Sequence, residues 1–135
     1  MNAPFAWSFE IAVRTLDQEA RGEPVAGQQA VAHVIVNRLK DGRWGTTLAA
    51  VCLAPYQFSG WNAHDPNRIR TLEMPDDDSG LVKLRPIMQA ALGGEADPTS
   101  GAMWYYAALI PKPGWAVGAE FCGQFGSQLF YKGVP

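Results

Sequence analysis

The sequence predicts a mainly α domain, of α+β type, with a small irregular or β-hairpin C-terminal part. Up to about residue 92, apolar residues recur at three- and four-residue spacing, which is typical of amphipathic helices. From residue 95 onward the chain is rich in Gly, Pro and aromatic residues, which favours short extended pieces between turns. The 135 residues, 47% of them hydrophobic, suffice for one core, so we expect a single domain over residues 1–135.

Four helical segments are expected before residue 95. They are Ser8 to Ala20 with Ser8 as the N-cap, Val25 to Lys40, Thr47 to Leu53, and one that ends near Leu92. The second is apolar around most of its circumference, which indicates a helix buried in the middle of the domain. Its polar stripe of Gln29, His33 and Asn37 faces solvent or lines a cleft, and we expect His33 to face solvent.

The rest of the chain is expected to be less regular. The polar segment from Tyr56 to Ser79 predicts a long loop, in which Asp76 to Asp78 form a turn or the start of a helix. Met103 to Leu109 and Gln128 to Lys132 predict extended pieces, and at most a small hairpin.

Charge and composition argue against several classes of partner. Eleven basic residues stand against 13 acidic ones without a basic run, so nucleic acid is not an expected partner. No stretch is long enough to span a bilayer, and the amino terminus lacks the pattern of an export signal. We therefore expect a monomer made in the cytoplasm, without stable membrane insertion.

The two cysteines and two histidines suggest no metal site. Cys52 and Cys122 permit one disulfide, although two buried thiols are the favoured interpretation. His33 and His64 belong to no cluster with metal-ligand spacing, so neither a metal nor another cofactor is expected. A cysteine amidase or peptidase that pairs one of these cysteines with one of these histidines is the weaker alternative.

Glu19 is the candidate for acid–base chemistry. It lies near the end of the first expected helix, beside a Gly-Glu-Pro break that would open a cleft next to the buried second helix. Its position at the border of the apolar stripe would allow burial, which keeps a carboxyl group protonated near neutral pH. Periodicity alone favours the alternative, a solvated glutamate at a helix end.

Other carboxylates compete for the same role. Glu23 follows four residues later, but the break at Gly22 and Pro24 should turn it away from Glu19, and we assign it to substrate binding. Asp17 and Asp65 are further candidates. Nothing in the sequence shows the facing pair of carboxylates that a two-carboxylate mechanism requires.

Aromatic and amide side chains gather between Tyr56 and Asn62, as they do in carbohydrate sites. The candidate substrate-binding residues are Gln57, Phe58, Ser59, Trp61 and Asn62, together with Tyr105 and Tyr106. Trp104 and Trp115 could add surface. The alternative, that Phe58, Trp104 and Trp115 simply fill the core, is equally plausible.

Several motifs resemble the SleB-type cell wall hydrolases, which include spore cortex-lytic enzymes and phage lysins. The resemblance is carried by Glu19-Ala20-Arg21-Gly22-Glu23-Pro24, by Gly27 to Ala32 with Val36-Asn37-Arg38, by Gln57-Phe58-Ser59, by Asp97 to Ala102 with Tyr105-Tyr106, and by Phe125-Gly126 with Phe130-Tyr131. It covers nearly the whole chain. One departure is Gln128, where the family often has a histidine; we assign Gln128 no catalytic part.

The resemblance implies a lysozyme-like fold related to lytic transglycosylases, with one catalytic glutamate that maps to Glu19 and no metal. The predicted reaction is cleavage of the bond between N-acetylmuramic acid and N-acetylglucosamine in peptidoglycan, as a lytic transglycosylase. The alternatives are a hydrolytic muramidase on the same bond and a non-catalytic glycan-binding or virion-associated module. The expected setting is a phage endolysin that acts on the bacterial wall.

Overall fold

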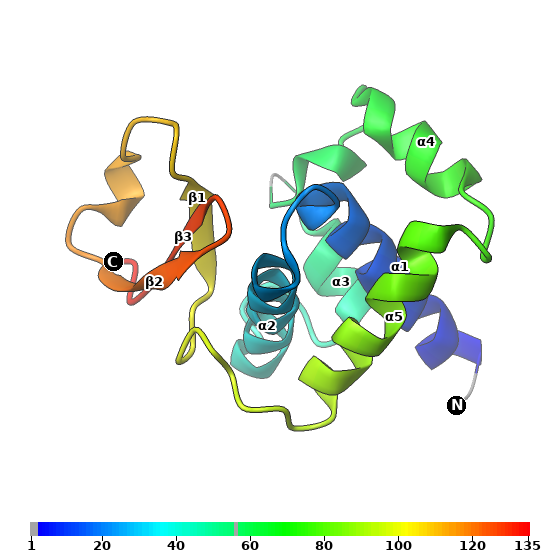
Figure 1. The fold of residues 1–135 in the computed structure, drawn as a ribbon, viewed down its shortest axis with the longest axis horizontal. Helices are drawn as coiled ribbons and strands as arrows, with labels where there is room; N and C mark the ends of the chain where they lie inside the picture. Colours follow the sequence, from blue (N-terminus) through cyan, green and yellow to red (C-terminus); the bar gives the residue numbers. More distant parts are fainter. Residues whose placement is uncertain (1–2, 56) are drawn as a thin grey trace.

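The computed structural model describes residues 3–55 and 57–135 and contains a helical part beside a small sheet (Figure 1). The helical elements are α1 (Ala3–Ala20), α2 (Val25–Asp41), α3 (Leu48–Leu53), η1 (Ser59–Trp61), α4 (Pro66–Glu73) and α5 (Ser79–Leu92). The C-terminal part contains β1 (Trp104–Ala107), η2 (Gly114–Ala116), β2 (Glu120–Phe125) and β3 (Gln128–Lys132). The predicted mainly α fold is therefore confirmed.

The core forms where α1, α2, α3 and α5 pack together. Helix α2 lies between the sheet and the other helices in Figure 1, so it is covered on several sides. Val31, Val34 and Ile35 are fully buried, as the apolar circumference of this segment predicts. The buried α2 thus holds the sheet and α1 in fixed positions around it.

Helix α1 begins earlier than predicted, and Ser8 is not its N-cap. Ser8 lies within the span of α1, and its hydroxyl accepts a hydrogen bond of 2.7 Å from the backbone N–H of Ala49, in the first turn of α3. The first N–H groups of a helix have no partner within it, so a hydroxyl from a neighbouring helix satisfies one of them. Ser8 therefore caps a helix other than its own.

The segment that the sequence predicts as one long loop contains η1 and α4; Tyr56 lies outside the described residues. Asp65 caps α4 by accepting from Asn67 N–H at 2.8 Å, and Pro66 occupies the first turn. Only Thr71 of this helix is buried, and its two large apolar residues, Ile69 and Leu72, are exposed, so the segment is too polar overall to stand out as a core helix. The prediction failed because polar contacts hold α4 in place.

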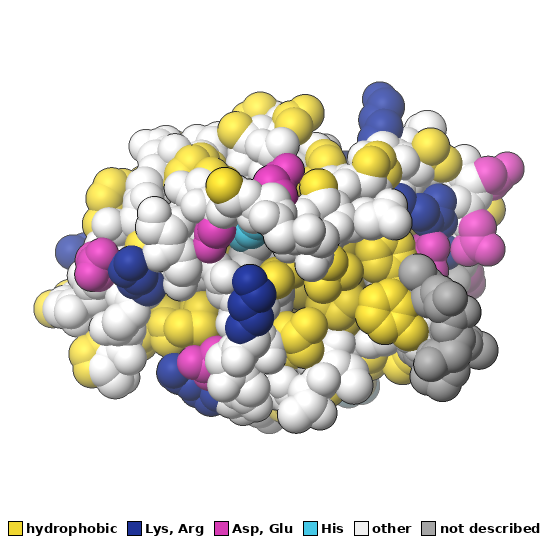
Figure 2. All heavy atoms as spheres, turned by 90° about the horizontal axis from the view of Figure 1, so that it is seen from below, with side chains coloured by type: hydrophobic (Ala, Val, Ile, Leu, Met, Phe, Trp, Pro, Cys, Tyr) yellow, Lys and Arg dark blue, Asp and Glu magenta, His cyan; other side chains and the backbone are white. Residues whose placement is uncertain are grey.

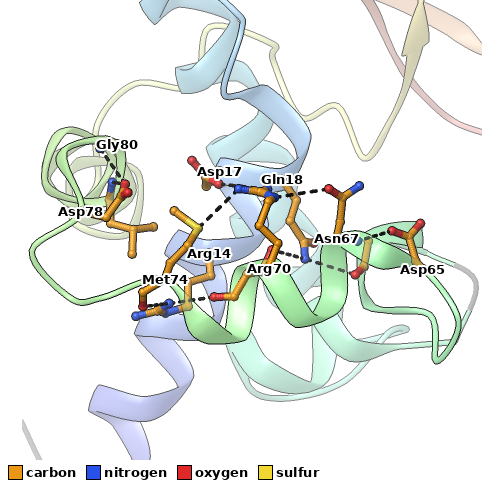
Figure 3. A network of polar contacts seen from close by, with 12 residues as sticks. Arg14, Asp17, Gln18, Asp65, Asn67, Arg70, Met74, Asp78 and Gly80 are labelled. Carbon is orange, nitrogen blue, oxygen red and sulfur yellow. Dashed lines mark hydrogen bonds and ion pairs between the residues drawn. The ribbon is translucent and has the colours of Figure 1, made fainter.

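These polar contacts run from α1 to α4 (Figure 3). Arg14 donates to the carbonyl oxygens of Thr71 at 2.9 Å and Met74 at 2.8 Å. The buried carboxylate of Asp17 pairs with Arg70 at 3.6 Å. At the next helix, Asp78 accepts hydrogen bonds from the first turn of α5, as the acidic run predicts.

The sheet has three antiparallel strands in the order β1-β3-β2, which is larger than the predicted hairpin. The missed strand, β2, carries no regular alternation of apolar and polar residues, and it contains Gly123. Its pairing with β3 shifts register between Phe121 and Gly123. An irregular strand of this kind leaves no clear signal in sequence.

The prediction that His33 faces solvent is wrong. Its side chain is buried, with Nε2 at 2.9 Å from the Glu95 carboxylate and Nδ1 at 3.8 Å from Asp97. One turn along the same stripe, Asn37 donates to Asp97 at 2.7 Å and to the carbonyl oxygen of Ala102 at 2.9 Å. The polar stripe of α2 therefore anchors the chain that leads into the sheet.

The face of the molecule in Figure 2 carries acidic and basic side chains interspersed, with apolar side chains visible between them. Among the described helices, none combines the length and hydropathy that a bilayer-spanning segment requires. The described residues also contain no cluster of three or more potential metal ligands among His, Cys, Asp and Glu.

Candidate active site

Glu19 lies in the last turn of α1 and reaches toward the sheet. The phenolic hydroxyl of Tyr105, on β1, donates a hydrogen bond to Glu19 Oε1. The Tyr105 ring stacks on Phe130 of β3, which is fully buried, so the hydroxyl is held in place by the packing of the sheet. The contact joins residues that are 86 positions apart in the sequence.

The environment of Glu19 favours its protonated form. Burial raises the pKa of the Glu19 carboxyl, because a charged group loses hydration there. The Tyr105 hydrogen bond and the positive charge of Arg38 act in the opposite direction and lower this pKa. Burial beside Glu19 also raises the pKa of Tyr105 well above its usual range, so Tyr105 remains a donor.

Arg38, on α2, is the buried cation of the site. Its guanidinium lies 4.8 Å from the ring centroid of Trp44 and 5.1 Å from that of Phe58. It donates to the carbonyl oxygen of Met103 at 2.8 Å and to Gln57 Oε1 at 3.3 Å. Arg38 therefore joins the segment after α3 to the residue that precedes β1, while its charge acts on Glu19.

Arg38 was not among the predicted site residues, although it belongs to the Val36-Asn37-Arg38 motif. The sequence did offer one signal for Arg38: it is a charged side chain within a helix that is otherwise apolar. A buried cation needs partners, so such a residue indicates a polar site. Its partners are two aromatic rings and two oxygen atoms from other segments, and these are set by tertiary structure.

The predicted glycan-binding segment lies along the last two turns of α1. Trp61 donates from Nε1 to Thr15 Oγ1 at 2.8 Å, and Gln18 donates to the carbonyl oxygen of Gly60 at 3.2 Å. A Cβ at Gly60 would lie 2.6 Å from the Gln18 amide, so any larger residue at this position would displace the Gln18 side chain. The segment therefore runs beside the helix that carries Glu19.

The predicted binding residues of this segment divide by exposure. Gln57, Ser59 and Asn62 are exposed, and Trp61 is partly exposed. Phe58 is buried beneath Arg38, which corresponds to the alternative of a core residue.

The Glu23 carboxylate is hydrogen-bonded within the protein. Its carboxylate accepts hydrogen bonds from the backbone N–H of Ser127 at 2.8 Å and from the Ser127 hydroxyl at 2.8 and 2.9 Å. The turn between β2 and β3 is thereby tied to the break between α1 and α2. The structure thus gives Glu23 the role of an anchor for the sheet.

Tyr106 does not lie with Tyr105. Successive residues of a strand point to opposite faces, and Tyr106 packs on the far face against Trp115 and Tyr131. Trp104 packs against Trp44. The sequence predicts Tyr105 and Tyr106 together as binding residues, but only Tyr105 contacts Glu19.

The other carboxylates considered from the sequence have separate partners. Asp17 lies two residues before Glu19, and residues two apart on a helix do not face each other. Its carboxylate is paired with Arg70, and Asp65 is the N-cap of α4.

The cysteine alternative lacks a suitable nucleophile. Cys52 is fully buried, and burial raises its pKa to about 12, so it is a thiol near neutral pH. Both cysteines are free, and Cys122 is partly exposed, which corrects the expectation of two buried thiols. The buried His33 ring contacts the Glu95 and Asp97 carboxylates, and His64 is exposed.

Together these contacts form a buried acid at the end of a helix, with a tyrosine donor, a nearby arginine and an aromatic and amide segment alongside. The fold is shared with the catalytic domains of SleB proteins. The chain belongs to the cell wall hydrolase family, whose model matches residues 22–131, and the resemblance to SleB-type enzymes is confirmed.

Two curated relatives are named spore cortex-lytic enzymes. The protein from Oceanobacillus iheyensis is 32% identical over 98% of this chain, and the protein from Halalkalibacterium halodurans is 30% identical over 96%. The chain spans 45% and 37% of their respective lengths.

Two solved structures share the fold. The catalytic domain of the germination-specific lytic transglycosylase SleB from Bacillus anthracis superposes with a TM-score of 0.74 at 24% identity, covering 93% of each chain. The catalytic domain of Bacillus cereus SleB gives a TM-score of 0.75 at 23% identity, covering 93% of this chain and 89% of that one.

Proposed function

We propose that this protein is a peptidoglycan glycosidase that cleaves the bond between N-acetylmuramic acid and N-acetylglucosamine, with Glu19 as its single acid/base. The observation that carries the proposal is the burial of the Glu19 carboxyl against the Tyr105 hydroxyl. Family membership and the spore cortex-lytic relatives support peptidoglycan as the substrate. The whole chain, residues 1–135, would act as one catalytic domain.

In the proposed reaction, protonated Glu19 donates its proton to the bridging oxygen as the glycosidic carbon–oxygen bond breaks. Positive charge then develops at the anomeric carbon, and the ionised Glu19 becomes the base. It takes the proton from the 6-hydroxyl of the muramic residue as that oxygen bonds to the anomeric carbon. The product is a 1,6-anhydro sugar, and Glu19 ends the cycle protonated.

The contacts made by the Glu23 and Asp17 carboxylates favour formation of the 1,6-anhydro product over hydrolysis. A second carboxylate facing the sugar would assist a water molecule or stabilise the sugar cation. Glu23 instead accepts hydrogen bonds from Ser127, and Asp17 pairs with Arg70. The 6-hydroxyl of the substrate would therefore supply the nucleophile.

The remaining predicted residues would bind the glycan. Gln57, Ser59, Trp61 and Asn62 present polar or aromatic groups from the segment beside α1, and Tyr105 would contact the sugar nearest Glu19. Phe58 would act indirectly, because it lies beneath Arg38. We propose that these residues line the groove in which the glycan binds.

The test is mass spectrometry of the fragments released from purified cell walls. The proposal predicts soluble muropeptides with 1,6-anhydro ends, lighter by one water than hydrolytic products. Reducing ends would instead identify a muramidase. Binding to the walls without release of fragments would contradict the proposed activity and favour a glycan-binding module.

The biological setting is a separate proposal. A phage endolysin and a spore cortex-lytic enzyme would act on different walls, so the initial rates on vegetative walls and on spore cortex should be compared. If the protein is an endolysin, it should release fragments faster from vegetative walls.

The expectation of a monomer is tested by light scattering.

A further inference from the structure

A pocket of about 220 Å³ lies between the end of α1 and the start of α5. The residues that line it include Asp17 and Arg21 from the end of α1, Gln28 of α2, and Ser79, Lys83 and Leu84 of α5. Sites that enclose a whole drug-sized ligand measure roughly 300–1,000 Å³. This smaller pocket therefore suits the end of a chain better than a run of sugar rings.

Arg21 and Lys83 bring two positive charges to this pocket. Both are exposed, and neither side chain forms a hydrogen bond or an ion pair with another described residue. Exposed Arg43, by contrast, is paired with Asp41. Two unpaired charges of one sign in a small concave site attract an ion of the opposite sign. The pocket therefore favours an anionic group.

Two acidic residues at the pocket already have partners. Asp17 is only 1% exposed, and its Oδ2 lies 3.6 Å from Arg70 Nη2. Asp78 turns to its own helix and accepts from the N–H groups of Gly80 at 2.9 Å and Leu81 at 3.2 Å (Figure 3). These carboxylates are therefore engaged within the protein, whereas the two cations remain free to bind a ligand.

The amide of Gln28 adds an acceptor to the same pocket. Its Nε2 donates to the carbonyl oxygen of Ala20 at 3.3 Å, which holds the amide at the end of α1. Gln28 is partly exposed, and no described group donates to its Oε1. A carboxylate for two cations and an N–H for an amide oxygen occur together at the C-terminal residue of a peptide.

The pocket lies within reach of a substrate bound at Glu19. Arg21 follows Glu19 by two residues, so their Cα atoms are at most about 7 Å apart. Their side chains point to different sides of the helix end. Gly22, which follows, is surrounded by open space. Three extended peptide residues span about 10 Å, so a peptide on the sugar beside Glu19 could pass this end of α1.

We propose that this pocket binds the C-terminal residue of the peptide that a muramic residue of peptidoglycan carries. Arg21 and Lys83 would hold the carboxylate, and Gln28 would accept from the backbone N–H. This inference rests on the proposed function and adds that the enzyme prefers glycan with its peptides attached. The contact lies away from the breaking bond, so it should act on KM rather than on kcat.

The first test compares wild type with the double variant Arg21→Gln/Lys83→Gln on soluble peptidoglycan fragments, before and after an amidase has removed the peptides. On fragments with peptides, KM should rise about 3- to 10-fold with little change in kcat, the effect of losing two exposed ion pairs. On the bare glycan the two proteins should have the same KM. The matched control is Arg68→Gln, which removes an exposed cation of α4 and should keep the wild-type KM on both substrates.

A second measurement detects the contact without turnover. Titration of the wild type with the free peptide L-Ala-γ-D-Glu-L-Lys-D-Ala should shift the NMR amide signals of Arg21, Gln28 and Lys83. The same peptide with an amidated C-terminus should bind about 3- to 10-fold more weakly, because it lacks the charge that the two cations recognise. Equal affinity for the two peptides would overturn the inference, and so would an equal rise of KM on the bare glycan.

The two proposals fail in different ways. If the wild type releases no fragments from either substrate, the proposed function fails. If it cleaves both, and the double variant keeps the wild-type KM on fragments with peptides, only the peptide pocket is contradicted.

Discussion

Glu19 is subject to opposing influences on its ionisation. Burial raises its pKa, whereas the Tyr105 hydrogen bond and the charge of Arg38 lower it. The acid needs its proton when the bond breaks, but it must also release that proton readily. Tyr105 and Arg38 therefore limit how far burial shifts the group.

The first prediction concerns Tyr105→Phe. Without the hydroxyl the pKa of Glu19 should rise further, so the alkaline limb of the pH–rate profile should move to higher pH. The rate should also fall about 10- to 100-fold, because the carboxyl group loses its positioning contact. The measurement is fragment release from purified walls over a range of pH.

Tyr106→Phe is the matched control for this prediction. It removes the same hydroxyl from the next residue of β1, on the opposite face of the sheet. Its alkaline limb should stay at the wild-type position. Equal shifts in the two variants would show that the effect does not pass through the contact with Glu19.

The second prediction concerns the buried guanidinium of Arg38. Arg38→Met should lower the free energy of unfolding by about 2 to 4 kcal/mol, because it removes a charge-assisted hydrogen bond to Met103 and leaves that carbonyl oxygen unpaired. Urea denaturation measures this change. Arg43→Met is the control: Arg43 is exposed and pairs with Asp41, so its loss should cost about 1 kcal/mol or less. Similar losses in both variants would contradict the account.

At the scale of elements, two contacts attach the sheet to the end of α1. Tyr105 of β1 bonds to Glu19, and Ser127 in the turn between β2 and β3 bonds to Glu23. The two glutamates are four residues apart: Glu19 lies in the last turn of α1, and Glu23 lies in the break between α1 and α2. The sheet thus positions the Glu19 carboxyl through Tyr105, while Glu23 fixes the turn between β2 and β3.

The third prediction tests the second attachment. Gly126 has φ +62°, and a Cβ there would lie 2.6 Å from Glu23 Oε1. Gly126→Ala should therefore combine backbone strain with loss of the contact and lower the free energy of unfolding by about 2 to 3 kcal/mol. Gly133→Ala, at φ +66° with open space around it, should show the strain alone, about 1 kcal/mol. Equal losses in urea denaturation would argue against the Glu23 contact.

The sequence predicted α2, α3 and α5 because their apolar spacing or caps follow from local rules. It missed α4 and β2, whose positions depend on polar contacts and on pairing with a distant strand. For the site, the motif around Glu19 predicted a catalytic residue, whereas helical periodicity alone favoured a glutamate exposed to solvent. The partner of Glu19 is 86 residues away, and only the register of the sheet distinguishes Tyr105 from Tyr106.

At the scale of the whole molecule, the raised pKa of Glu19 links stability to pH. The folded state holds the Glu19 proton more tightly than the unfolded chain, so this group stabilises the fold at low pH. That contribution is lost as the pH rises from the ordinary glutamate pKa through the raised value in the folded protein. Above that range, Glu19 therefore makes the folded protein less stable than an uncharged side chain at the same position would.

The fourth prediction follows from this linkage. Glu19→Gln should raise the melting temperature at neutral pH, because the amide is neutral at every pH and avoids burial of a charge. The difference from wild type should shrink as the pH falls below the ordinary glutamate pKa. Thermal denaturation across this range is the measurement, and a variant that is less stable than wild type at neutral pH would contradict the prediction.

The most direct test of the account is the rate at which Glu19→Gln releases fragments from purified peptidoglycan. Glu73→Gln, the same change at an exposed residue of α4, serves as the control. The account predicts that Glu19→Gln folds and loses about 10²- to 10⁴-fold or more in rate, while Glu73→Gln keeps the wild-type rate. A folded Glu19→Gln variant that releases fragments as fast as the control would contradict the central claim.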